Sequence, residues 1–174
     1  MANTFTEFNL TDGQEAERKL LKTFVNVASS GTPEWELIGD GIEESSIEYN
    51  TDTETSTDIL GQTRTKVNKT EPAQSFEPYT VRGGSKLAFI LWDIYRRNAV
   101  SELTQFKVLV VHEFVGSSTG YAAETQDNCT ITVTSLGGSA YVDMPISISY
   151  SNKKTLGKVT YVGEVPTFAA DSGL

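Results

Sequence analysis

The sequence has very few of the side chains on which enzymatic and metal-dependent chemistry most often relies. Its 174 residues include one cysteine, Cys129, and one histidine, His112. A single cysteine excludes an internal disulfide and a cysteine zinc site, and a single histidine excludes a site built on two histidines. We expect a packed strand histidine and a small buried thiol, and therefore no enzymatic activity. Carboxylate-only glycosidase chemistry is the enzymatic alternative that this composition leaves open.

Long hydrophobic runs and positive charge are also scarce. No apolar run approaches the roughly 18–20 residues that a membrane-spanning helix requires. Residues 1–7 lack a basic region followed by an apolar one, so we expect no secretory signal. The 14 basic and 23 acidic residues give a net charge of −9, which argues against tight phosphate binding. The sequence thus predicts one soluble domain without a membrane partner.

Two short motifs invite a ligand interpretation, and neither is complete. Residues 52–58 place oxygen-bearing side chains at alternate positions but lack the glycine and the final glutamate of an EF-hand calcium loop. Residues 82–86 (Arg-Gly-Gly-Ser-Lys) precede an expected helix without the order and spacing of a phosphate-binding loop. We expect residues 52–58 to form a solvated or interface loop and residues 82–86 to form a helix-capping turn. We therefore expect no metal and no cofactor.

A long polar segment, residues 51–69, dominates the organisation of the chain. Two short alternating runs flank it, residues 45–50 and 75–79, which predicts a β-hairpin whose tip projects beyond its own sheet. Loops longer than about 12–15 residues usually serve a partner or a ligand, or are disordered. Ile59 and Leu60 are an apolar pair within this polar segment. They either fold back onto the domain or contact a partner.

One helix is expected, at residues 85–98. Its apolar residues recur with the spacing of an amphipathic helix: Leu87, Ile90, Leu91 and Ile94. Ser85 is a suitable N-cap, and Asn98 is suited to end the helix.

The rest of the chain has the alternation of β-strands. Residues 106–115 are apolar on both faces, which predicts a central buried strand. Residues 142–150 alternate around Pro145, which suggests an edge strand or a bulge there. Other strands are expected at 20–27, 35–39, 129–134 and 158–163. Together these elements predict a mainly β fold of two packed sheets, sandwich-like or barrel-like, with one flanking helix and a projecting hairpin.

Two terminal arms are expected on either side of a β domain that spans residues 19–163. The N-terminal arm is residues 1–18 and the C-terminal arm is residues 164–174. Apolar residues in otherwise polar surroundings suggest that the arms dock on a partner. The candidate interface residues of the arms are Phe5, Phe8, Leu10, Pro166 and Phe168.

Several segments resemble the major tail (tail tube) proteins of long-tailed phages, most closely those of phages of Gram-positive hosts. We expect a non-contractile tail, and a contractile tail is the alternative, because the tubes of both kinds share the fold. The resemblance covers residues 19–163. It is carried by Lys19-Leu20-Leu21-Lys22-Thr23-Phe24-Val25-Asn26, Trp35-Glu36-Leu37-Ile38-Gly39, Ser46-Ile47-Glu48-Tyr49-Asn50, Ile59-Leu60-Gly61-Gln62-Thr63, Ser75-Phe76-Glu77-Pro78-Tyr79 and the later helix.

The resemblance implies a structural protein of the virion tail that is made in the host cytoplasm. Its subunits would form hexameric rings that stack into a hollow tube, through which DNA passes without specific binding. Tail tip, tape measure and tail terminator proteins would be its further partners. The long loop would contact the adjacent ring through Ile59, Leu60, Gly61, Gln62, Thr63 and Arg64.

A monomeric β-sandwich that binds a carbohydrate or a peptide is the alternative function. Trp35, Trp92, Tyr49 and Tyr79 would then supply a stacking platform. A compact monomer with a saturable ligand site would favour this alternative over the tail tube.

Overall fold

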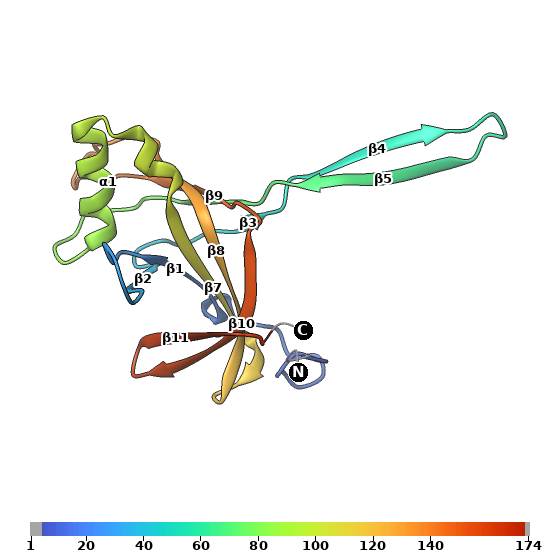
Figure 1. Cartoon of the computed structure of the whole chain (residues 1–174), viewed down its shortest axis with the longest axis horizontal. Coiled ribbons are helices and arrows are strands. Elements are labelled where there is room, and N and C mark those ends of the chain that lie inside the picture. Colours follow the sequence, from blue (N-terminus) through green and yellow to red (C-terminus); the bar gives the residue numbers. More distant parts are fainter. Residues whose placement is uncertain (1–4, 173–174) are drawn as a thin grey trace.

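The computed structural model describes residues 5–172, which form a β-rich body with one long projecting hairpin (Figure 1). Residues 1–4 and 173–174 of the predicted arms lie outside the described residues. In chain order the elements are η1 Arg18–Leu20, β1 Leu21–Asn26, β2 Trp35–Ile38, β3 Ile47–Glu48, β4 Thr51–Thr57, β5 Thr63–Thr70, β6 Ala73–Phe76, α1 Lys86–Arg97, η2 Val100–Thr104, β7 Phe106–Ser117, β8 Gly120–Val133, β9 Ile146–Ser149, β10 Lys154–Val162 and β11 Val165–Ala170.

Within the described residues, nine strands form one curled antiparallel sheet that forks at β8. The main path is β2-β1-β7-β8-β9-β6-β3, and β10 and β11 branch from β8. Residues 121–126 of β8 pair with β10, whereas residues 130–133 pair with β9. Asn128, with a φ of 55°, lies between the two pairings. The predicted mainly β fold, with one helix and a projecting hairpin, is confirmed. Its two layers are limbs of one sheet.

The main hydrophobic core lies between these limbs and α1. It includes Phe76, Leu91 and Ile148, all at most 1% exposed. Strand β7 runs through the centre of the sheet, and its residues 108–111 are all fully buried. They alternate between the main core and a second apolar cluster on the opposite face. The prediction of a central strand is therefore confirmed, with burial on both faces at residues 108–111, whereas residues 112–116 are half-buried.

Helix α1 has the boundaries that its sequence predicts. The Ser85 hydroxyl accepts a hydrogen bond from the backbone N–H of Ala88 at 3.2 Å. Asn98 ends the helix in the left-handed conformation, at φ 56°. Leu87, Leu91 and Ile94 are buried, so the predicted apolar stripe faces the sheet.

The N-terminus of α1 is occupied by a carboxylate of the protein itself. Glu36, on β2, accepts hydrogen bonds from the backbone N–H groups of Lys86 at 2.9 Å and Leu87 at 3.0 Å. It also accepts one from the Ser85 hydroxyl at 2.6 Å. A helix N-terminus favours negative charge, and here Glu36 supplies it. Residues 82–86 therefore serve as a turn and helix cap, and the position that a phosphate would take is filled.

Replacing this internal anion is expected to destabilise the fold. Glu36→Gln removes the charge that faces the helix dipole and weakens hydrogen bonds to a charged acceptor, a loss of about 1–3 kcal/mol. The urea unfolding midpoint measures this loss, provided that the slope is unchanged. Glu34→Gln is the matched control because Glu34 pairs with Lys86 at the surface, where such pairs contribute about 0–1 kcal/mol. Equal losses from both variants would contradict the capping role of Glu36.

The predicted strand at residues 142–150 is wrong in its extent and its position. Strand β9 begins at Ile146, directly after Pro145, and lies between β8 and β6. Proline has no N–H to donate to a sheet, so a strand with two neighbours begins after it. The Pro145 carbonyl accepts a hydrogen bond from the Thr134 N–H at 2.9 Å, and Pro145 thus marks the start of an interior strand. It marks neither an edge nor a bulge.

Candidate assembly interface

The polar segment 51–69 is a regular two-stranded ribbon that leaves the body. Every residue of β4 is exposed, and in β5 only Thr70 is partly covered. The ribbon projects from the end of the body opposite α1 (Figure 1). An isolated two-stranded hairpin is at best marginally stable in water. The ribbon buries no apolar face of its own, and both of its faces are open to solvent.

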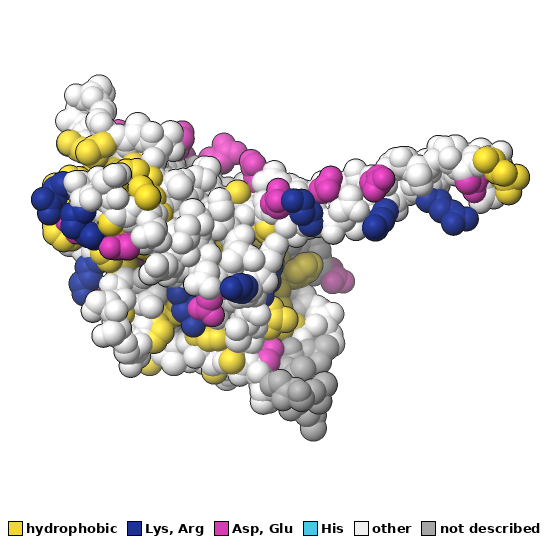
Figure 2. Space-filling view, turned by 45° about the horizontal axis from the view of Figure 1, so that its top comes forward, with side chains coloured by type: hydrophobic (Ala, Val, Ile, Leu, Met, Phe, Trp, Pro, Cys, Tyr) yellow, Lys and Arg dark blue, Asp and Glu magenta, His cyan; other side chains and the backbone are white. Residues whose placement is uncertain are grey.

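The two faces of the ribbon differ in chemistry. Thr53, Thr55 and Thr57 lie opposite Val67, Thr65 and Thr63, which makes one face a ladder of β-branched side chains. On the other face Glu54 lies opposite Lys66 and Ser56 lies opposite Arg64. Figure 2 shows acidic and basic side chains along the ribbon. Residues 52–57 of the acidic run that resembled a calcium loop thus lie on an extended strand beside basic residues, and Asp58 lies in the turn at the tip. Residues 5–172 contain no group of three or more side chains that could hold a metal ion.

The tip of the ribbon is a hydrogen-bonded turn that exposes two aliphatic side chains. The Asp58 carboxylate accepts hydrogen bonds from the N–H groups of Leu60 at 2.9 Å and Gln62 at 3.0 Å. Gly61 adopts φ 77°, which glycine tolerates without strain. The tip residues Ile59 and Leu60 are 103% and 79% exposed. They do not fold back onto the domain, and their contact with a partner remains a prediction.

A large apolar groove lies beside α1. Its volume is about 950 Å³. Phe89 and Trp92 line it from α1, and Val81, Leu136 and Val142 line it from two loops. All five are 40–64% exposed. Contiguous exposed apolar surface on a folded protein marks an interaction site, and the structure thus offers a second candidate interface that sequence reasoning missed.

Both terminal segments lie against the body of their own protomer as far as the structure describes them. The Asn9 side-chain amide donates hydrogen bonds to the carbonyls of Glu113 at 3.0 Å and Gly116 at 2.8 Å. The Phe8 ring lies 5.8 Å from that of Phe114 yet is 64% exposed. Phe5, half-buried, lies under the Lys158 ammonium, 5.2 Å from its ring centroid. Leu10 is also half-buried.

The predicted C-terminal arm includes strand β11, which pairs with β10 over residues 165–170. Pro166 is buried, and Phe168 is half-buried and packs against the second apolar cluster. Contacts of these arm residues with another subunit remain predictions.

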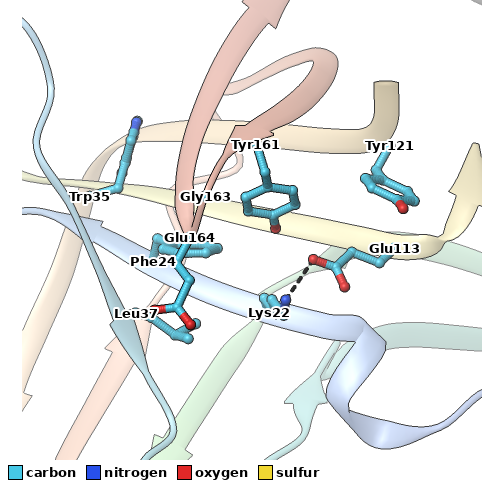
Figure 3. A pocket seen from close by; sticks show the side chains of 9 residues that line it. All are labelled: Lys22, Phe24, Trp35, Leu37, Glu113, Tyr121, Tyr161, Gly163 and Glu164. Atoms are coloured by element: carbon cyan, nitrogen blue, oxygen red, sulfur yellow. Dashed lines mark ion pairs between the residues drawn. The ribbon is translucent and has the colours of Figure 1, made fainter. Parts of the chain in front are cut away.

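A second concavity lies on the face opposite the main core (Figure 3). Its volume is about 450 Å³. Lys22 and Glu113 form an ion pair across it at 2.7 Å, and the Lys22 ammonium lies 5.2 Å from the ring centroid of Tyr161. The buried Tyr161 hydroxyl has no hydrogen-bond partner among the described residues. Burial and the nearby Glu113 carboxylate raise the pKa of Tyr161.

The aromatic residues expected to form a stacking platform are not brought together. Trp35 lines the concavity of Figure 3 and Trp92 lines the groove beside α1. Tyr79 is buried in the main core, and Tyr49 is exposed next to β3.

His112 and Cys129 do not form a catalytic cysteine–histidine pair. His112 lies opposite Ala122, whereas Cys129 lies opposite Phe106, at the other end of the β7–β8 pairing. Burial lowers the pKa of His112 and raises that of Cys129.

Within residues 5–172, no helix has the length and apolar character needed to cross a bilayer.

Comparisons with known proteins find similarity of fold without detectable similarity of sequence. No family model matches the chain, and no curated protein matches it. A cryo-EM structure of the sheath/tube terminator of the extracellular contractile injection system PVC aligns with a TM-score of 0.52 at 12% identity, over 82% of this chain and 96% of that one.

Two further structures align less closely. A chain of the PVC sheath–tube complex aligns with a TM-score of 0.47 at 14% identity, over 80% of this chain and 88% of that one. The tube-terminating cap of the anti-feeding prophage aligns with a TM-score of 0.45 at 13% identity, over 86% of this chain and 99% of that one. Of these three, only the terminator exceeds a TM-score of 0.5. The chain therefore shares the fold of a tube terminator of a contractile injection system.

Proposed function

We propose that this protein is a structural subunit of a phage-tail-like tube, which self-assembles into hexameric rings that stack on one another. The observation that carries the proposal is the projecting ribbon, whose apolar tip is exposed to solvent and forms a turn hydrogen-bonded to the Asp58 carboxylate. A surface of this kind needs a partner, and a second surface on the same chain, the groove beside α1, is apolar as well. Contacts between unlike surfaces of identical chains generate rings when they close and filaments when they do not.

The edges of the curled sheet support lateral joining of subunits. Strand β2 ends one side of the main path, and β11 ends the branch formed by β10 and β11. Unpaired strand edges are templates for pairing with another chain, and proteins normally protect them. In the proposed ring, neighbouring subunits cover these edges.

The shared fold with a contractile-system tube terminator supports a place in a phage-tail-like assembly. Tail tip, tape measure and terminator proteins would be the other partners of the tube. DNA would pass through its lumen without specific binding, because a net charge of −9 per chain repels phosphates. Assembly would take place in the host cytoplasm, and the mature protein would be part of the virion tail.

A tube terminator is the second candidate function. It is favoured by one observation, the TM-score of 0.52 to a chain described as a terminator and covered over 96% of its length. A terminator would form one ring that closes a tube, whereas a tube subunit adds ring after ring.

Sedimentation velocity over a concentration series tests the proposal. A tube subunit is expected to give species that grow in size with concentration beyond a single ring. A terminator would stop at one ring size at every concentration. A monomer that binds a glycan or a peptide saturably at the concavity of Figure 3, and never assembles, would overturn both candidates in favour of a binding module.

A further inference from the structure

We infer that the groove beside α1 receives the Ile59–Leu60 tip of a second copy of this chain. The inference rests on the proposed self-assembly and adds to it by naming the receptor surface. The tip is a convex apolar knob and the groove is a concave apolar surface, both on one polypeptide.

The positions of the two surfaces require the contact to be made between molecules. The tip and α1 lie at opposite ends of the longest axis of the molecule (Figure 1). Hydrophobic side chains are visible at both ends in the space-filling view, and at the end of the body they lie among charged ones (Figure 2). A protomer cannot bend its own ribbon into its own groove, and two tips or two grooves are not complementary in shape. The contact is therefore head-to-tail, and each added copy leaves a free tip and a free groove for the next.

The chemistry of the groove fits aliphatic side chains. Its lining is dominated by Val81, Phe89, Trp92 and Val142, and its volume of about 950 Å³ is ample for one isoleucine and one leucine side chain. The tip needs no rearrangement to enter it, since the Asp58 carboxylate already fixes the turn. Such preorganisation lowers the entropic cost of binding.

Charged side chains of both signs lie around both surfaces. Two ion pairs lie near the groove, Arg82 with Asp40 and Lys86 with Glu34. The ribbon next to its tip is acidic on β4 and basic on β5. An apolar centre with a rim of mixed charge is the usual anatomy of a specific interface.

Disulfide trapping between two variants that each carry one added cysteine tests the contact. Leu60→Cys places a thiol on the tip, and Val142→Cys places one in the groove. The native Cys129 is fully buried and its pKa is raised, so it does not compete in mild oxidation. Leu156→Cys is the matched control for the groove, because Leu156 is similarly exposed, at 59% against 52% for Val142, but lies on β10.

The expected result is a covalent dimer when L60C is mixed with V142C, at least tenfold more abundant than when L60C is mixed with L156C. A double variant carrying L60C and V142C is expected to give a ladder of higher multimers, as a head-to-tail contact requires. Equal or absent cross-linking in the two mixtures would overturn the inference. Electron microscopy of the wild-type protein separates this failure from failure of the proposed function, because tubes without the cross-link would leave self-assembly intact with another receptor for the tip.

Discussion

Serine at positions 59 and 60 is expected to abolish the growth of long assemblies and to leave the protomer folded. The two side chains are 103% and 79% exposed, so their replacement should change the free energy of unfolding by less than about 0.5 kcal/mol. In the proposed assembly each would be buried, which would contribute about 1.5–3 kcal/mol per side chain. Loss of both is expected to raise the critical concentration for assembly by two orders of magnitude or more, as measured by pelleting.

A matched control separates the tip from the rest of the ribbon. Val67→Ser removes an aliphatic side chain that is 60% exposed on the threonine face, well away from the turn, and is expected to assemble normally. Deletion of residues 53–67 is the larger form of the same change, and should give a folded protomer that makes no long tubes. Tubes of normal length from either the deletion or the double serine variant would contradict the assigned role of the ribbon.

Two substitutions on α1 are expected to separate folding from assembly. Leu91 is fully buried in the main core, and Leu91→Ala is expected to cost about 2–5 kcal/mol of stability through lost burial and a residual cavity. Phe89 lies on the same helix but is 64% exposed and lines the groove. Phe89→Ala should therefore change stability by less than about 0.5 kcal/mol and raise the critical concentration for assembly.

Urea unfolding and pelleting of the two variants provide the measurement. Leu91→Ala should lower the unfolding midpoint, and any assembly defect should disappear at temperatures where the variant is fully folded. A loss of stability in Phe89→Ala comparable to that in Leu91→Ala would show that Phe89 is a core residue. Normal assembly of a stable Phe89→Ala protein would remove the groove from the interface.

The elements with strong local patterns were predictable from the sequence. Helix α1 was predicted within one residue at each end because its apolar spacing, its serine cap and Asn98 all agree. Strand β7 was predicted as central because apolar side chains lie on both faces of residues 106–115. The ribbon was predicted to project, but its strands were not. In Thr51–Thr57, threonine alternates with other polar residues. A strand is normally recognised in a sequence by the alternation of apolar and polar residues, and this run has no apolar residues.

Features that depend on distant parts of the chain were not predictable. The fork in β8 arises because its first half pairs with β10 and its second half pairs with β9. The local sequence pattern predicts a strand but does not indicate with which other strand each half pairs. The groove joins residues near 28, 81–92 and 136–142, whose apolar side chains resemble ordinary core residues when taken separately. The capping of α1 by Glu36 likewise joins β2 to a helix 50 residues later.

Negative-stain electron microscopy of the purified wild-type protein, across a concentration series, tests the central claim most directly. The account predicts hollow tubes of stacked rings, which lengthen with concentration and are absent when Ile59 and Leu60 are replaced by serine. Single rings at every concentration would contradict the tube-subunit assignment and favour the terminator. Dispersed monomers at every concentration, even after addition of tail-tip components, would contradict self-assembly altogether.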